Sequence, residues 1–338
     1  MARPDILIAG GGVMGLAIAL ELRQQNHQVT LLSQNFAAAA GHAAAGMLAP
    51  SAEQIASRPM ADLCLQSLDL YPAWVSKLEG LTGFDSGYWP CGILAPTLAA
   101  KIEHEVIKPD LAGSTISLSA EATHSYQAGL SSKITGAHFY PDDGQIDNRA
   151  LMKALKSAAQ DLGVNIEEGI SVEGVMQRKQ QVTGLRTSAG MKQAAHYVIA
   201  MGAWSGELVP IPVVPRKGQM LALRVPSGYE RVQPLRRVLY GEKVYIVPRR
   251  DGRIIVGATV EDVGFTPHNT PAGMAEILSA AVELYPALKD FPIEECWWGF
   301  RPATPDELPV LGAGPCENLT LATGHYRNGI LLAPITAR

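Results

Sequence analysis

The sequence predicts an α/β protein in which a doubly wound domain is interrupted by a second, mainly antiparallel β domain. A short apolar run, Asp5–Ala9, leads through a glycine-rich turn into the helical stretch Val13–Gln24, which is how a doubly wound unit begins. A second buried run, His196–Ala200, lies far along the chain. Between Val213 and Val260, apolar runs alternate with turn residues, as in antiparallel sheets.

Length and composition set the scale of the molecule. The chain has 338 residues, a net charge of −4 and 47% hydrophobic residues, which is enough for two domains of about 100–200 residues each. The charge balance lacks the basic excess of nucleic-acid-binding proteins. No apolar run reaches the ~20 residues of a membrane span. We therefore expect a cytoplasmic protein that binds neither nucleic acid nor membrane.

The cysteines and histidines predict neither disulfides nor a metal site. Cys64, Cys91, Cys296 and Cys316 lie far apart and form no CxxC pair, so we interpret them as reduced thiols of a cytosolic protein. The eight histidines form no HxH, HExxH or Cys/His cluster, and we predict that no metal is bound.

The glycine turn carries the first chemical signal. Gly10, Gly12 and Gly15 match the GxGxxG pattern between a strand and a helix. The first glycine permits the tight turn, the second lets the backbone approach a pyrophosphate, and the third lets helix and strand pack closely. The free N–H groups at the helix start attract phosphate. With the next strand, His27–Leu32, this unit predicts a Rossmann-type dinucleotide site.

The second strand lacks the acidic residue that usually binds the ribose hydroxyls. Leu32 is followed by Ser33 and Gln34. A neutral hydrogen bond contributes about 0.5–1.5 kcal/mol, whereas one to a carboxylate contributes about 1.5–3 kcal/mol, so we expect a weaker adenosine contact. The missing acid leaves NADP formally open. No arginine follows Ser33 to bind a 2′-phosphate, so we do not favour NADP.

The alanine-rich segment Ala37–Met47 permits two interpretations. It can be an alanine-rich helix or linker, although Gly41 and Gly46 disfavour one continuous helix. It can also be a stretch of small residues that allows the backbone to approach a flat ring. The residues themselves do not separate these alternatives.

The rest of the chain alternates helical and extended signals. Asp147 or Asn148 can cap the helix that follows them, and Gly163 ends that helix. We predict helices at Ser51–Leu78, interrupted near Pro59, and at Arg149–Leu162. We predict strands at Gly92–Ala95 and Val164–Val172, a turn at Asp142–Gly144, and a hairpin of Val244–Pro248 with Arg253–Thr259 around Asp251-Gly252.

Three further features are candidates for ligand binding. Arg301 is flanked by Trp297, Trp298, Phe300 and Pro302; an enclosed guanidinium suits bidentate capture of a carboxylate, although a surface ion pair is the commoner fate of an arginine. Tyr245 sits between apolar neighbours, as a packed tyrosine would. The turn-rich segment Gly324–Gly329 precedes an apolar run and is typical of a loop that enters a helix N-terminus, which suits an anion or an electron-rich ring.

Together these segments resemble the glycine oxidases, flavoenzymes of thiamine biosynthesis in the D-amino-acid/sarcosine oxidase superfamily. The resemblance extends over nearly the whole chain. Its most specific motif is Gly324–Pro334, whereas many flavoproteins share the N-terminal glycine turn. The other matching segments are Ala43–Leu48, Tyr245–Arg249 and Gly299–Pro302.

The resemblance implies roles for individual residues. Arg301 would pair with the substrate carboxylate, assisted by the Tyr245 hydroxyl, and the Arg327 backbone carbonyl would accept a hydrogen bond from the substrate amine. The expected residues for non-covalent FAD are Gly10, Gly12, Val13, Met14, Gly15, Ser33, Gln34, Ala45, Gly46, Met47, Val172, Gly202, His325, Tyr326, Arg327, Asn328, Gly329, Ile330 and Leu331. Ser33 stands where the family usually has Glu.

The implied reaction is the oxidation of glycine. A hydride would pass from the α-carbon of neutral glycine to the flavin N5, the imine would hydrolyse to glyoxylate or serve thiazole synthesis as dehydroglycine, and dioxygen would reoxidise the flavin with release of hydrogen peroxide. A sarcosine or D-amino-acid oxidase and a dehydrogenase with another electron acceptor remain alternatives. A flavin- or nucleotide-sensing module without catalysis is the alternative from a different class.

Domain boundaries and partners complete the predictions. We assign residues 1–85, 140–210 and 290–338 to the FAD-binding domain, and residues 86–139 and 211–289 to the substrate-binding domain. We also expect a homo-oligomer. Pro334 is predicted in the first turn of a final helix that has only about one turn left before Arg338. From this we expect that the natural polypeptide continues, either through that helix or into a fused or interacting thiazole synthase.

Overall fold

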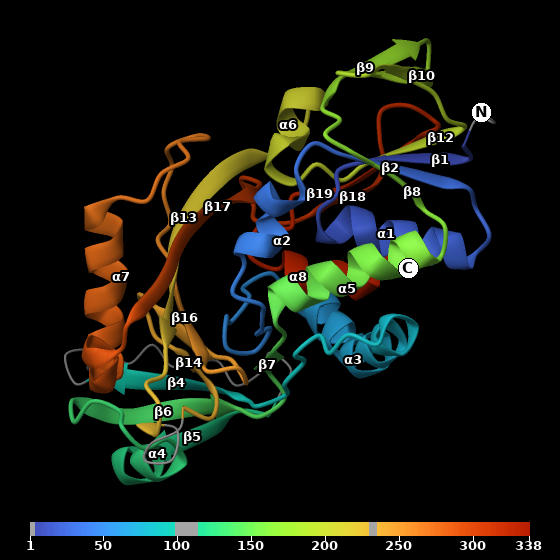
Figure 1. Cartoon of the computed structure of the whole chain (residues 1–338). Coiled ribbons are helices and arrows are strands. Elements are labelled where there is room, and N and C mark those ends of the chain that lie inside the picture. Colours follow the sequence, from blue (N-terminus) through green and yellow to red (C-terminus); the bar gives the residue numbers. More distant parts are fainter. Residues whose placement is uncertain (1–3, 99–113, 230–234) are drawn as a thin grey trace.

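A six-stranded sheet carries the glycine turn at the edge formed by the carboxyl ends of its strands (Figure 1). The computed structural model describes residues 4–98, 114–229 and 235–338. The sheet is parallel except for β18, which pairs antiparallel to β19. Its strands, in spatial order, are β18 (Val310–Ala313), β19 (Leu319–Thr323), β12 (His196–Ile199), β1 (Ile6–Ala9), β2 (Val29–Ser33) and β8 (Asn165–Glu168).

Both faces of this sheet are covered, which explains the continuous apolar run of its first strand. Ile8 packs into the core beneath the helices, whereas Leu7 and Ala9 pack into a second core on the opposite face. The helices of the first core lie together in Figure 1: α1 (Val13–Gln24), α3 (Arg58–Thr82), α5 (Asn148–Asp161) and α8 (Gly329–Ala337). The opposite face is covered by a three-stranded sheet of β11 (Gly190–Lys192), β10 (Gln181–Thr187) and β9 (Val172–Arg178).

An eight-stranded sheet forms the second part of the molecule, and α7 (Pro271–Leu284) packs against it (Figure 1). All of its pairings are antiparallel except the one between β14 and β4. Its strands, in spatial order, are β17 (Ile293–Ala303), β13 (Val214–Arg224), β16 (Arg253–Gly257), β15 (Tyr245–Pro248), β14 (Val238–Tyr240), β4 (Ile93–Leu98), β6 (Ile134–Tyr140) and β5 (Ile116–Ser119). The predicted α/β architecture with a mainly antiparallel second sheet is confirmed.

Short elements complete the described chain. Strands β3 (Met47–Leu48) and β7 (Gly144–Gln145) pair antiparallel near the junction of the two large sheets. The remaining elements are the helices α2 (Ala40–Ala43), α4 (Ala120–Tyr126) and α6 (Ser205–Leu208) and the 3₁₀ helices η1 (Phe36–Ala38), η2 (Gly202–Trp204) and η4 (Pro286–Asp290).

Several predicted helices and strands are present in the structure with different first or last residues. Helix α3 starts at Arg58, so Pro59 lies in its first turn, where the missing N–H is tolerated, and does not interrupt a helix. The predicted strand Val164–Val172 is two strands, β8 and β9, because Gly169 at φ 76° turns the chain between two sheets. Asp147 caps α5, accepting from the backbone N–H groups of Arg149 and Ala150, as predicted.

One prediction near the end of the chain is wrong in detail. Pro334 is the sixth residue of α8 and not part of its first turn. Residues 293–303 form strand β17 and pair with β13 in the eight-stranded sheet. The limits of the two domains stay a prediction.

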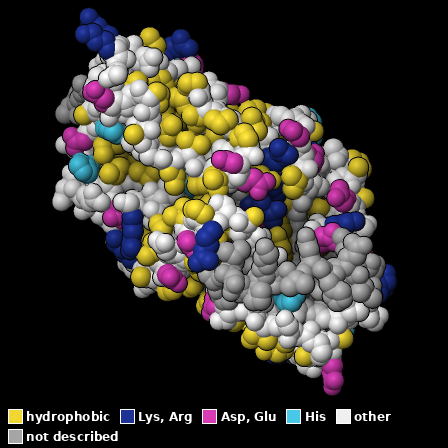
Figure 2. Space-filling view, turned by 180° about the vertical axis from the view of Figure 1, so that it is seen from behind, with side chains coloured by type: hydrophobic (Ala, Val, Ile, Leu, Met, Phe, Trp, Pro, Cys, Tyr) yellow, Lys and Arg dark blue, Asp and Glu magenta, His cyan; other side chains and the backbone are white. Residues whose placement is uncertain are grey.

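The surface of the described residues mixes both charges. Figure 2 shows acidic and basic side chains interspersed over the face opposite to that of Figure 1. None of the helices within the described ranges combines the length and the apolar character that crossing a membrane requires.

Candidate functional site

The glycine turn fits tightly against the strands behind it. Gly10 has φ +116°, and a Cβ on it would lie 2.3 Å from the Ala200 carbonyl oxygen. A Cβ on Gly15 would lie 1.8 Å from the Gly10 carbonyl oxygen. Gly12, by contrast, has no neighbour nearer than 3.9 Å at its Cβ position and caps α1 without a side-chain hydrogen bond. The turn therefore leaves the N–H groups of the first helical turn open to a phosphate.

The end of β2 is built differently from an acidic ribose site. Ser33 is buried and lies against the turn, since a Cβ on Gly11 would be 2.5 Å from the Ser33 Oγ. Gly11 is thus required as well as the three glycines of the motif, which the pattern alone did not indicate. Ser33 and Gln34 line the cavity at the position where a carboxylate of the protein usually binds the ribose hydroxyls.

The segment Ala37–Met47 is not one helix. Two short helical turns, η1 and α2, are followed by Gly46 at φ 69°. The buried guanidinium of Arg249 holds the end of this segment in place, because its Nη2 donates a hydrogen bond to the Ala45 carbonyl at 2.7 Å. Arg249 also donates to Gln145 Oε1 at 2.6 Å, and burial lowers the pKa of Arg249 to about 10. The interpretation as an alanine-rich helix is therefore wrong, and the small residues line the cavity.

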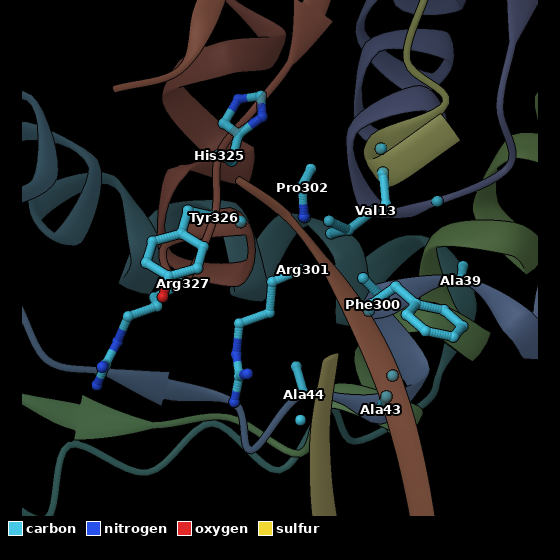
Figure 3. Close-up of a pocket in the computed structure, with 18 of the residues that line it drawn as sticks. Val13, Ala39, Ala43, Ala44, Phe300, Arg301, Pro302, His325, Tyr326 and Arg327 are labelled. Atoms are coloured by element: carbon cyan, nitrogen blue, oxygen red, sulfur yellow. The ribbon is translucent and has the colours of Figure 1, made fainter. Parts of the chain in front are cut away.

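One cavity of about 830 Å³ connects the glycine turn to the eight-stranded sheet (Figure 3). It falls within the range of ligand pockets in proteins. All but two of the residues predicted to bind FAD or substrate line it. The exceptions are Gly15, whose role is packing against Gly10, and Leu331, which is buried in the helical core. Figure 3 shows that the labelled residues reach this cavity from several elements.

Arg301 reaches the cavity from β17, where successive side chains point to opposite faces. Its Nη1 donates to the Thr259 carbonyl at 3.1 Å and the Lys217 carbonyl at 3.4 Å. The neighbouring Phe300 ring points away from it in Figure 3 and packs at 5.2 Å, centroid to centroid, from Phe265. Two backbone carbonyls therefore hold the guanidinium, whose remaining N–H groups are suited to a carboxylate.

Tyr245 lies beside Arg301 and keeps its proton. Its hydroxyl is 3.8 Å from the Met220 Sδ, and Gly257 provides the space for it, since a Cβ there would lie 2.9 Å from the hydroxyl. Burial raises the pKa of Tyr245 above its ordinary value, although the positive charges of Arg301 and Arg327 act in the opposite direction. The phenol is a hydrogen-bond donor next to a cation.

A third charged group enters from the loop before α8. The Arg327 Nη2 lies 3.2 Å from Glu53 Oε1 and 3.2 Å from the Tyr240 hydroxyl. The predicted role of Arg327 concerned its backbone carbonyl, whereas the structure shows its side chain in an ion pair. Burial is the largest single influence and disfavours the charge, but Glu53, Tyr240 and Tyr245 together raise the pKa of Arg327 above its ordinary value.

His325 is a structural member of the same loop. It is buried, which lowers its pKa to about 3, and its Nε2 lies 3.1 Å from the Thr336 Oγ1. The neutral ring ties the loop to α8. Among the described residues, no group of three or more His, Cys, Asp or Glu side chains forms a possible metal site.

Besides Gly11, sequence reasoning missed four contributors: Glu53, Tyr240, Gly218 and Gly257. Glu53 follows the matching segment Ala43–Leu48 closely, which was the only local signal for it. The glycines could not be identified, because their function depends on side chains that come from neighbouring strands, Arg301 from β17 and Tyr245 from β15.

Comparisons with known proteins agree with this geometry. Residues 5–338 match the family described as FAD dependent oxidoreductase. The "Bifunctional protein ThiO/ThiG" of Trichormus variabilis is 58% identical over 98% of this chain, but the match covers 51% of that protein. The chain thus spans about half the length of such curated relatives. The glycine oxidase of Geobacillus kaustophilus is 32% identical over 99% of this chain and 91% of its own length. The crystal structure of glycine oxidase from that organism superimposes with a TM-score of 0.92, 32% identity and coverage of 100% of this chain and 93% of that chain.

Proposed function

This chain belongs to the FAD dependent oxidoreductase family and, within it, to the glycine oxidases, and from this premise we propose that it oxidises glycine in thiamine biosynthesis. One observation supports this assignment above the others. The glycine turn and the Arg301–Tyr245 pair line the same cavity, so one ligand space would join a dinucleotide phosphate site to a carboxylate site. A small amino acid is the substrate that such a site can orient against a bound cofactor.

The cavity fits FAD by its shape and by its donors. The Gly10–Gly15 turn cannot accommodate side chains at its first and last glycines, and it leaves backbone N–H groups for the pyrophosphate. Ser33 and Gln34 would contact the adenosine, and Ala45, Gly46 and Met47 would pass close to the ring. When bound, FAD takes two electrons from the substrate α-carbon and delivers them to dioxygen.

The side chains of the sheet bind and orient the substrate. The guanidinium of Arg301, held by the carbonyls of Thr259 and Lys217, would receive the substrate carboxylate. Tyr245 remains protonated and would donate a hydrogen bond to the same carboxylate. The backbone carbonyl of Arg327 would accept from the substrate amine. No residue in this scheme has to remove a proton from carbon if the amine reacts in its neutral form.

The partner follows from the relatives. Their name combines ThiO and ThiG in one bifunctional protein, and we propose that this chain works together with a thiazole synthase, which would consume the imine formed from glycine. We also propose a homo-oligomer in the cytoplasm. The four cysteines are free thiols, which suits a reducing compartment.

An anaerobic titration with glycine tests the function. Purified protein should be yellow, acid precipitation should release the colour into the supernatant, and glycine should bleach the flavin absorbance without oxygen. Readmitted oxygen should restore the colour and yield one hydrogen peroxide per flavin. A panel of glycine, sarcosine and D-alanine separates the related oxidases. Flavin that none of these substrates bleaches would instead favour a non-catalytic binding module.

A further inference from the structure

The ion pair of Glu53 and Arg327 is a feature of the cavity that the proposed reaction does not use. The Glu53 side chain is 11% exposed and that of Arg327 is 34% exposed, and both residues line the cavity with Arg301 and Tyr245. A carboxylate this far from water is stabilised only by a counter-ion or by hydrogen bonds. Arg327 supplies the positive charge, and Tyr240 shares the same guanidinium nitrogen.

Glu53 is held in place by the turn that carries it. Its backbone N–H donates to the Ala49 carbonyl at 3.0 Å. The buried carboxylate of Asp143 accepts from the N–H of Ala52 at 2.8 Å and that of Ser51 at 3.3 Å. The backbone that carries Glu53 is therefore held at the cavity wall by contacts that do not involve Arg327.

Other titratable and charged groups lie near this pair. The charges of Arg301, Arg327 and Glu53 all act on the hydroxyl of Tyr245 on β15. Cys64 on α3 feels Glu53, although burial is the larger cause of its raised pKa. The other charged residues lining the cavity are Glu173, Glu207, Glu242, Lys243 and Glu276.

The summed charge of Arg301, Arg327, Glu53 and a bound substrate depends on whether the substrate amine is protonated. A substrate carboxylate neutralises Arg301, and Arg327 neutralises Glu53. With a neutral amine, the two positive and two negative charges cancel. An ammonium would add a positive charge, and both carboxylates already have a guanidinium as counter-ion. An amine must lose its proton before its α-carbon can give up a hydride, because the nitrogen lone pair stabilises the developing cation.

We propose that Arg327 is the counter-ion that prevents Glu53 from binding the substrate as an ammonium, and that this ion pair makes the pocket specific for the neutral amine. The inference rests on the proposed function and assigns a role to two side chains of that site. Arg327 is thus a specificity-determining residue, and the proton of the ammonium is released to solvent.

The test uses two single variants whose effects must have opposite signs. In Arg327→Met, Glu53 is left uncompensated and should attract the ammonium; in Glu53→Gln, Arg327 is left uncompensated and should repel it. Glycine and propionate are the probes, because propionate has the same shape and carboxylate with a methyl group in place of the ammonium. Dissociation constants come from rapid anaerobic mixing for glycine and from the flavin absorbance change for propionate.

We expect Arg327→Met to raise the preference for glycine over propionate at pH 7 about tenfold, and Glu53→Gln to lower it about tenfold, each equal to about 1.4 kcal/mol. The pH at which the flavin reduction rate reaches half of its maximum should rise in the first variant and fall in the second. The double variant Glu53→Gln/Arg327→Met should return near the wild type. Lys243→Met, which removes a positive charge from the same cavity without breaking the pair, should change the preference less than about threefold.

Opposite signs cannot come from general damage to the fold, which would shift both variants in the same direction. Shifts of the same sign, or an unchanged preference in both variants, would overturn the proposal. A wild-type flavin that glycine does not bleach would refute the proposed function instead. The preference for propionate over its neutral amide would then still report whether Arg301 binds a carboxylate.

Discussion

The guanidinium of Arg301 occupies the space that a side chain on Gly218 would need. A Cβ on Gly218 would lie 2.4 Å from the Arg301 Nη1 and 2.7 Å from its Cζ. Gly218 lies on β13 and Arg301 on the neighbouring β17, two positions apart in the register of that pairing, where Gly218 is opposite Gly299 and Arg301 is opposite Arg216. The absence of a side chain on one strand therefore determines where the positive charge of the other strand can lie.

Substitution Gly218→Ala should displace Arg301 and leave the fold intact, because the atoms it meets are the far end of a flexible side chain. We expect the glycine KM to rise roughly tenfold to 100-fold, since a displacement of about 1 Å can cost that much. FAD content and melting temperature should stay near the wild type. Gly80→Ala in α3, where no atom lies within 4 Å of the new Cβ, is the matched control. If Gly218→Ala and Gly80→Ala had the same glycine KM, Arg301 would not be displaced by a side chain at position 218.

Arg301→Ala should weaken glycine binding far more than FAD binding. Breaking an enclosed, hydrogen-bonded charge pair costs about 2–5 kcal/mol, which corresponds to roughly 30-fold to several thousand-fold in the apparent KM. Tyr245→Phe should cost about 0.5–3 kcal/mol, the range of one hydrogen bond. Steady-state peroxide assays give both values. Unchanged glycine kinetics in Arg301→Ala would refute its assignment.

Ser33 offers a test of the adenosine contact in both directions. Ser33→Asp restores a carboxylate at the end of β2 and should tighten FAD binding about fivefold, from the difference between charged and neutral hydrogen bonds. Ser33→Ala should weaken binding by a similar factor. Flavin fluorescence quenching on titration of the apoprotein measures both dissociation constants. Weaker binding in Ser33→Asp would mean that Gln34 or the helix N-terminus carries this contact.

Asp143 should make the stability of the protein fall as the pH rises. Burial raises the pKa of Asp143 from 3.8 to about 7. Because the folded state holds the proton more tightly, its contribution is fully present below pH 3.8 and is lost as the pH rises through about 7. The Asp143→Asn variant lacks this titration. Its free energy of unfolding relative to the wild type should therefore increase by a few kcal/mol between pH 4 and pH 8.

Urea unfolding at several pH values with saturating FAD measures that difference. The comparison with the variant cancels the carboxylates whose pKa is lowered in the folded state, such as Asp147 and Glu261, which act in the opposite direction. A difference between the two proteins that stays constant with pH would exclude a titrating Asp143.

Arg249→Met should loosen the cavity wall at Ala45. The buried guanidinium donates to Ala45, Gln145, Ile146 and Asn148, and each buried acceptor left without a donor costs about 1–3 kcal/mol. We expect a loss of a few kcal/mol in stability and a higher FAD dissociation constant. The adjacent Arg250, which is exposed and lies 5.6 Å over the Trp89 ring, is the control. Arg250→Met should change stability by less than about 1 kcal/mol.

The sequence by itself determined the doubly wound sheet and one end of the cavity. The Asp5–Gln24 unit could be identified because its strand, turn and helix are local: apolar runs, glycine conformation and helix periodicity depend on near neighbours. The hairpin around Asp251-Gly252 and the Asp147 cap were predictable for the same reason. Arg301, Tyr245 and Arg327 could be selected from their motifs, but not placed relative to one another.

Tertiary structure alone decided the other end of the cavity. The contact of Arg327 with Glu53 joins residues 274 positions apart, and that of Arg249 with Ala45 joins residues 204 positions apart. Such pairings follow from the packing of two sheets and carry no local pattern. The same is true of Gly218, whose role exists only because β17 brings Arg301 against it. Short-range rules specify elements, whereas the charge and shape of a site formed between elements depend on how those elements pack.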